Sequence, residues 1–201
     1  MAEEVRYHLA VDIGASSGRH ILFSLQNGKI ESEEIYRFEN GMEKKDGNLL
    51  WNTERLFTEI VNGMKECKTA GKIPCTMAID TWAVDYVLLD ENDNVLGETF
   101  GYRDKRTDGM DEAVFGLISE KDLYKRTGIQ KQNFNTIYQL TADRILRPEI
   151  LKSAKTFLML PDYFHFLSGT GHDTRLHHNR KPSAPFWDLA VIGFQIQRRQ
   201  S

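Results

Sequence analysis

The sequence predicts an α/β domain, and three observations lead to that fold class. The first forty residues contain three consecutive strand-like segments joined by tight turns. An amphipathic helical pattern follows them, and short apolar strands then alternate with helical patterns. The 201 residues are 40% hydrophobic and 27% charged, as in ordinary soluble globular proteins, and suffice for one good core.

The opening strands are expected at residues 7–12, 20–24 and 29–38. The first is short and apolar and stops just before a glycine. Between the second and third stands Asn27-Gly28, a pair that suits the positive φ angles of a type I′ hairpin turn. The chain therefore begins as strand–strand–strand and not as a strand–helix–strand unit.

A helix is expected to begin just after Trp51, with Asn52 or Thr53 as its N-cap. Its apolar side chains recur at helical spacing along one face, at Leu56, Phe57, Ile60, Val61 and Met64. This pattern predicts a helix that packs one face against the sheet.

The remainder of the domain is expected to alternate between strands and helices. Ser119, with Asp122 three residues later, is close to a capping box, and Pro148 marks the end of a helix. The expected strands are 76–80, 84–89 and 156–160, and the expected helices are 108–117, 120–126 and 135–146.

The character of the sequence changes after Gly171. Residues 172–201 lack a period of 3.6 or 2, apart from a brief apolar run at 189–194. We therefore expect a domain over residues 1–171 and an irregular carboxy-terminal tail over 172–201. A basic RNA-binding tail is the alternative, which the scarcity of interleaved aromatic residues disfavours.

Several function classes find no support in the composition. A net charge of −3 gives no overall footprint for nucleic acid or for an anionic membrane. No apolar run approaches the roughly 20 residues that cross a bilayer, and the first residues do not resemble a signal peptide. Cys67 and Cys75 have no metal-ligand company, so we expect ordinary thiols. A cytoplasmic location is expected.

The turn after the first strand is the candidate phosphate site. Its backbone N–H groups and the hydroxyls of Ser16 and Ser17 can donate hydrogen bonds to a phosphate. Gly14 and Gly18 let the chain approach a ligand closely, and Arg19 can neutralise negative charge. The alternative is a plain β-hairpin in which glycine and serine only make the turn.

Asp12, at the end of the first strand, is the candidate magnesium ligand. Mg²⁺ prefers oxygen ligands and keeps part of its hydration, so the carboxylate can hold the ion directly or through water. The turn is not a Walker A loop, because it lacks the Gly-Lys-Ser/Thr ending. It is not a dinucleotide-binding fingerprint either, because a strand follows it and not a helix.

The segment Ile79–Tyr86 is the candidate sugar site. The carboxylates of Asp80 and Asp85 can accept hydrogen bonds from sugar hydroxyls, and the Trp82 ring can cover an apolar sugar face. A polar turn with Trp82 as a core anchor is the alternative. Two further polar clusters, at 102–107 and 133–136, are candidates of lower weight, since each could be a solvated loop.

Taken together, these segments resemble the FGGY carbohydrate kinases, and among them most closely the kinases of L-rhamnulose. The resemblance runs from residue 6 to about 171, with six segments in the family's order. They are residues 11–19, Phe38-Glu39-Asn40-Gly41, Ile79 to Tyr86, Tyr102-Arg103-Asp104, Phe134 to Leu140 and Leu158 to Phe164.

The resemblance implies an actin-like ATPase fold with a ribonuclease-H-like mixed sheet flanked by helices. It implies transfer of the γ-phosphate of ATP, with Mg²⁺ as cofactor, to the 1-hydroxyl of L-rhamnulose. It also assigns roles to the residues of the candidate sites. The phosphate turn is Ala15, Ser16, Ser17, Gly18 and Arg19, and the sugar contacts are Asp80, Trp82, Ala83, Asp85, His172 and Thr174.

The resemblance also implies that Asp173 is the catalytic base, which accepts the proton of the attacking hydroxyl. The chain departs from the family pattern in two places. Ala83 stands where the family usually has glycine, and His172-Asp173-Thr174 follows Gly171 earlier than in the family.

Two other functions remain open at this point, a non-catalytic remnant that binds sugar weakly or not at all, and another actin-fold ligand-binding protein. Because a second domain would cover part of this one, we also expect self-association through an uncovered apolar face.

Overall fold

The computed structural model describes residues 5–169, which fall into two compact units. Within the described residues, unit 1 contains positions up to 43, positions 51–83 and positions from 160 onward. Unit 2 contains positions 44–50 and 84–159. The tail over 172–201 lies outside the described residues, and the expected domain boundary at 171 stays a prediction.

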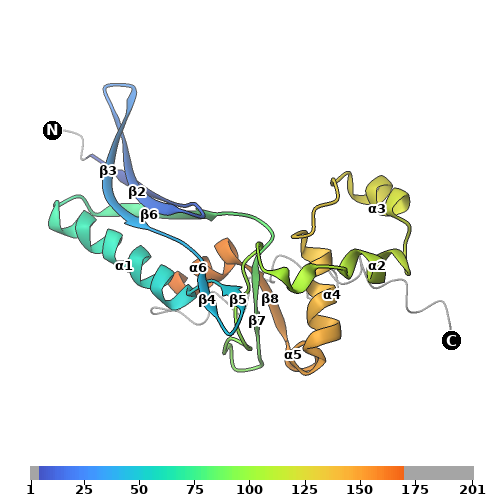
Figure 1. The fold of residues 1–201 in the computed structure, drawn as a ribbon. Coiled ribbons are helices and arrows are strands. Elements are labelled where there is room, and N and C mark those ends of the chain that lie inside the picture. The colour runs from blue at the N-terminus through green and yellow to red at the C-terminus, as the bar shows by residue number, and fades with distance from the viewer. Residues whose placement is uncertain (1–4, 170–201) are drawn as a thin grey trace. The chain divides into compact units, whose positions relative to one another are not determined.

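Unit 1 is built on a four-stranded mixed sheet in the order β3-β2-β1-β6 (Figure 1). Its strands are β1 (Tyr7–Ile13), β2 (Ser17–Gln26), β3 (Lys29–Glu39) and β6 (Pro74–Thr81). The first three pair antiparallel, and β6 lies parallel to β1. The expected three-strand opening is thus confirmed. Asn27 and Gly28, both at positive φ (51° and 74°), make the expected hairpin turn.

Helix α1 (Thr53–Thr69) contacts β2 and β3 of this sheet (Figure 1). Asn52 is its N-cap, since the side chain accepts a 3.0 Å hydrogen bond from the backbone N–H of Arg55. The face toward the core buries Leu56, Ile60, Gly63 and Cys67. The helical spacing of the apolar residues therefore predicted the helix and part of its packed face, at Leu56 and Ile60, but the placing of Met64 on that face was wrong, since it is 42% exposed.

Helix α6 (Leu160–Gly169) also belongs to unit 1 and contacts β6. The expectation that a strand extends through Leu160 was wrong, because the helix begins at that residue. Pro161 stands at the start of the helix, where a missing N–H is harmless, and Asp162 lies in the positively polarised first turn. The local signals for a helix start thus outweigh the apolar run that precedes them.

His20 is a core residue of unit 1. It is fully buried on β2, and its ring lies against α1, where a Cβ added at Gly63 would come within 2.3 Å of it. Its Nε2 donates a 3.1 Å hydrogen bond to the Ile60 carbonyl, whereas Nδ1 finds no partner among the described residues. Burial lowers the pKa of His20, although the Ile60 carbonyl and Glu59 oppose this effect.

The buried imidazole of His20 is expected to make the free energy of unfolding depend on pH. The unfolded chain binds a proton at His20 near pH 6.5, but the folded chain does so only at lower pH. The free energy of unfolding is therefore expected to fall as the pH decreases from 7 to 5. Urea unfolding of the wild type and of His20→Gln measures it, and the variant is expected to lose part of the slope. Parallel pH profiles would contradict this role for His20.

Unit 2 contains a two-stranded sheet and most of the helices. Strand β7 (Tyr86–Leu89) pairs antiparallel with β8 (Thr156–Met159). The helices are α2 (Met110–Phe115), α3 (Glu120–Thr127), α4 (Thr136–Leu146), α5 (Pro148–Ser153) and the 3₁₀ turn η1 (Lys105–Thr107). Part of the core of this unit is formed by Tyr86, Leu88, Ala154 and Phe157.

The expected helices of unit 2 are confirmed with small shifts at their ends. Ser119 caps α3, since its hydroxyl accepts a hydrogen bond from the Asp122 N–H. Strand β7 begins two residues later than expected, because Val84 has a left-handed backbone (φ 74°) that no strand contains. Helix α5 and the short strands β4 (Glu43–Lys45) and β5 (Asn48–Leu50) were not predicted.

In the described part of the chain, no helix combines the length and apolar character needed to cross a membrane.

Candidate functional site

Asp12 and Arg19 face each other across the antiparallel pair β1–β2. The Nε and Nη2 atoms of Arg19 donate hydrogen bonds of 3.0 and 2.9 Å to one carboxylate oxygen of Asp12, Oδ2. About half of each side chain is exposed, 49% for Asp12 and 46% for Arg19. An ion pair so open to water is weak, so either group can turn to a ligand at little cost in free energy.

Asn40 holds the turn between these strands through two hydrogen bonds to its backbone. Its side-chain Nδ2 donates a 2.8 Å hydrogen bond to the Gly14 carbonyl, and its backbone N–H donates a 2.9 Å bond to the Ser16 carbonyl. Asn40 Oδ1 in turn accepts from Arg55 Nη2 on α1 at 3.2 Å. Two carbonyl oxygens of the turn are thereby occupied, and a carbonyl oxygen is the group that would repel a bound phosphate.

Sequence reasoning missed this role of Asn40. The residue belongs to the segment Phe38–Gly41, which was noted only for its resemblance. A local signal was present in the Asn-Gly pair, but its partner Gly14 lies 26 positions away. No pattern within one strand could have joined the two.

The two glycines of the turn have different surroundings. A Cβ at Gly14 would lie 3.2 Å from the Ser17 carbonyl, a tight but nearly tolerable approach. A Cβ at Gly18 would lie 2.1 Å from the Phe38 ring, so glycine is required there for the ring to pack on β2. The structure therefore gives Gly18 a packing reason, and its contact with phosphate stays a prediction.

Asp80 extends the pair of Asp12 and Arg19 into a row on three strands. It lies on β6 in register with Asp12 on β1, and Asp12 is in register with Arg19 on β2. Residues in register on adjacent strands project from the same face of a sheet. The fold thus brings two carboxylates to a single face of unit 1, next to the turn, together with the guanidinium groups of Arg19 and, in register with it on β3, Arg37. Asp80 itself is exposed.

Trp82 follows β6 and stacks on Trp51, with ring centroids 4.0 Å apart and planes inclined by 35°. Trp51 is buried, whereas Trp82 is half-buried. Trp82 thus has an anchor in unit 1 and retains some exposed ring surface. Ala83 is exposed and is the last residue of unit 1 before Val84 begins unit 2.

Asp85, in unit 2, is fully buried and its carboxylate is occupied. Oδ1 accepts a 2.9 Å hydrogen bond from Gln139 Nε2, and Oδ2 accepts a 3.0 Å bond from the Tyr102 N–H. The neighbouring Tyr86 donates its hydroxyl to Asp143 at 2.7 Å, and burial raises the pKa of Tyr86 well above its usual value. These two residues stabilise the interior of unit 2, and contact of Asp85 with sugar stays a prediction.

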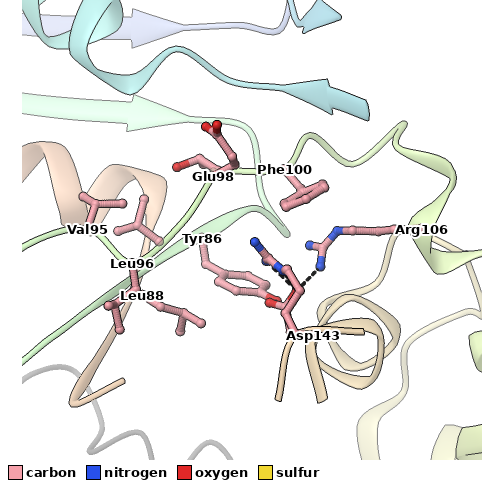
Figure 2. A pocket seen from close by; sticks show the side chains of 11 residues that line it. Tyr86, Leu88, Val95, Leu96, Glu98, Phe100, Arg106 and Asp143 are labelled. Atoms are coloured by element: carbon pink, nitrogen blue, oxygen red, sulfur yellow. Dashed lines mark hydrogen bonds and ion pairs between the residues drawn. The ribbon is translucent and has the colours of Figure 1, made fainter. Parts of the chain in front are cut away.

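The polar cluster 102–107 also turns inward. Asp104 is buried, caps η1 and accepts a 2.7 Å hydrogen bond from the Leu49 N–H. Arg106 forms a buried ion pair with Asp143 near Tyr86, beside the Phe100 ring (Figure 2). The sequence did not predict that Asp104 and Arg106 are buried, because their partners Leu49 and Asp143 lie 55 and 37 positions away along the chain.

Three predicted site residues, His172, Asp173 and Thr174, lie outside the described residues. Among residues 5–169, no group of three or more His, Cys, Asp or Glu side chains gathers in a way that could hold a metal ion. Cys67 and Cys75 are both free thiols.

The described part of the chain has an actin-like α/β fold, with a mixed sheet flanked by helices. Solved sugar kinases have this fold. A gluconate kinase and a xylulose kinase, both from Lactobacillus acidophilus, match with a TM-score of 0.66 over 81% of this chain and 33% of their own. At 16% identity, this likeness shows the fold alone.

The chain belongs to the FGGY family of carbohydrate kinases, because the model of that family's N-terminal domain matches residues 7–174. It is 55% identical to a rhamnulokinase of Halalkalibacterium halodurans over 163 residues, which cover 81% of this chain and 35% of the relative. A rhamnulokinase of Oceanobacillus iheyensis is 51% identical over 160 residues, 80% of this chain and 34% of the relative. The chain thus spans about a third of the length of these relatives.

Proposed function

We propose that this chain supplies the sugar-binding domain and the phosphate turn of an ATP-dependent rhamnulokinase. The observation that carries the proposal is the turn from Asp12 to Arg19, which presents a carboxylate and a guanidinium beside a backbone that Asn40 holds in place. The 55% identity to a rhamnulokinase supports L-rhamnulose as the sugar.

The residues present fit a magnesium ion. Both Arg19 donors use Oδ2 of Asp12, which leaves the second carboxylate oxygen to bind a cation or its water. Asp80, in register on β6, adds a further carboxylate on the same face. When bound with ATP, the ion would neutralise charge on the phosphate oxygens. Asp12 would hold it, and Arg19 would be free to bind phosphate.

In the proposed reaction, the 1-hydroxyl oxygen of L-rhamnulose bonds to the γ-phosphorus while the bond from that phosphorus to the ADP oxygen breaks. The hydroxyl proton passes to the carboxylate of Asp173. Ser16, Ser17 and the N–H groups of the turn bind phosphate oxygens. Asp80, Trp82, Ala83 and Asp85, with His172 and Thr174, orient the sugar.

A coupled ADP-release assay with L-rhamnulose and ATP tests the activity. Turnover by the wild type and its loss, by at least about 100-fold, in Asp173→Asn are expected if that carboxylate is the base. Glu98→Gln, which breaks an exposed ion pair with Lys45, is the matched control and is expected to keep full activity. Absence of turnover at high enzyme concentration would overturn the proposed activity for this chain.

A non-catalytic sugar-binding protein is the second candidate. Phosphoryl transfer depends on groups positioned around both substrates, so a part of the kinase can bind sugar without turnover. Calorimetric titration with L-rhamnulose separates this candidate from the first. Stronger binding of xylulose or glycerol would instead indicate another ligand-binding protein of this fold.

We further propose a cytoplasmic location, where ATP is available, and self-association through an apolar surface of unit 2. Side chains around α3 are largely exposed there, at Leu117 (55%), Tyr124 (58%) and Ile129 (61%). They line an open hollow of about 1360 Å³. Sedimentation velocity is expected to show a larger species at higher concentration, and Tyr124→Lys is expected to reduce it. A strictly monomeric sample at all concentrations would contradict this expectation.

A further inference from the structure

Val84 has the backbone conformation least suited to its side chain. Its φ of 74° lies in the left-handed region, where a β-branched residue is a true outlier. The other non-glycine residues with positive φ in the described chain are Asn27, Asp46 and Asp93, which belong to the types that tolerate this region. Val84 therefore persists in this conformation only because its surroundings hold it there.

Two side chains of α4 hold the Val84 carbonyl. It accepts a hydrogen bond of 3.1 Å from Thr136 Oγ1 and another of 3.1 Å from Gln139 Nε2. Gln139 Nε2 also lies within hydrogen-bond distance of Asp85 Oδ1 (2.9 Å) and of the Phe134 carbonyl (3.0 Å), so its two N–H donors are shared among three acceptors, two of them on the successive residues Val84 and Asp85.

The orientation of the Gln139 amide is itself fixed. Its Oε1 accepts a 2.9 Å hydrogen bond from Arg106 Nη2, so its NH₂ group must point toward Val84 and Asp85. Arg106 is held by the buried carboxylate of Asp143 (Figure 2). Gln139 is only 1% exposed. A buried chain of polar groups thus ends on the strained carbonyl.

We propose that Gln139 is a positioning residue that keeps Val84 in its left-handed conformation and so fixes the backbone that follows Trp82 and Ala83. This inference rests on the proposed function insofar as these residues contact the sugar. Strained backbone that is held by its surroundings concentrates at ligand sites, where it fixes contact groups before the ligand arrives. With the network removed, Val84 relaxes and the sugar meets a backbone that must be ordered on binding.

A double-mutant cycle tests the coupling between the two residues without any ligand. Gln139→Leu is expected to lower Tm by roughly 4–8 °C, because it leaves buried polar groups without a partner. In a Val84→Gly background, the same substitution is expected to cause a larger loss, because the relaxation of Val84 offsets part of the loss in the wild type and glycine has no strain to release. Equal losses of Tm in the two backgrounds would overturn the proposal.

Sugar affinity gives the second readout. Calorimetry with L-rhamnulose is expected to show binding about 10-fold weaker for Gln139→Leu and recovered in part by Val84→Gly in the double variant. A purely structural Gln139 would lower Tm without that rescue. If the wild type binds no sugar, the proposed function fails, and the thermal cycle still decides whether Gln139 holds Val84.

A milder pair of variants covers the case in which Gln139→Leu does not fold. Thr136→Val removes only the second hydrogen bond to the Val84 carbonyl. Thr141→Val, on the same helix, removes a bond to the Ile137 carbonyl of that helix and is the matched control. Thr136→Val is expected to lower Tm more in the Val84→Gly background than in the wild type, whereas Thr141→Val is expected to act equally in both. Equal effects of Thr136→Val in both backgrounds would overturn the proposal.

Discussion

Asp143→Asn is expected to lower the free energy of unfolding by about 3–5 kcal/mol, because it removes a buried carboxylate that neutralises two arginines. Asp143 is fully buried, and its Oδ1 pairs with Arg106 and, at 2.6 Å, with Arg147. Both guanidinium groups also lie over the Phe100 ring, 4.3 Å from its centre. Asparagine keeps the shape and an acceptor for Tyr86 but leaves buried positive charge without a counter-charge.

Urea unfolding followed by circular dichroism measures this effect, because unit 2 contains most of the helices. Glu34→Gln is the matched control, since it breaks an ion pair with Arg37 whose side chains are 40% and 51% exposed. That change is expected to cost less than about 1 kcal/mol. If Asp143→Asn lowered the free energy of unfolding by no more than this control does, water would have to reach Arg106 and Arg147 and stabilise their charges.

The elements that the sequence could predict are those with a local signal. The apolar spacing of α1 and the cap at Asn52 specify that helix without help from the rest of the fold. Strands β4 and β5 have three residues each, too few for any period, and they form through pairing alone. Leu160 continues an apolar run and yet begins a helix, because the proline and the aspartate that follow favour a helix start.

The candidate site likewise has residues that the sequence places together and residues whose partners only the fold reveals. Asp12 and Arg19 stand within one turn, and the sequence alone placed them together. Asp85 and Tyr86 were selected because polar and aromatic residues at a strand end suit a sugar. Their buried partners, Gln139 and Asp143, lie 54 and 57 positions away, so only the fold shows that these side chains are already engaged.

The second large effect is expected at Asp12, where Asn removes the charge that would hold Mg²⁺. Calorimetric titration of the wild type with ATP is expected to show tighter binding when Mg²⁺ is present. Asp12→Asn is expected to lower the affinity for Mg²⁺ and ATP together by at least about 10-fold, since a charged oxygen ligand is lost. Asp46→Asn, another exposed aspartate at a turn, is the control and is expected to behave as the wild type.

The sign of the effect without Mg²⁺ separates a metal ligand from a residue that only stabilises the turn. Asp12 repels phosphate and occupies Arg19 through two hydrogen bonds, so its neutralisation frees a guanidinium for the nucleotide. In the presence of EDTA, Asp12→Asn is therefore expected to bind ATP as well as the wild type or better. If Asp12 only stabilised the turn, the variant would bind ATP more weakly under both conditions. A reversal of the ranking when Mg²⁺ is added is the outcome that a carboxylate on the metal requires.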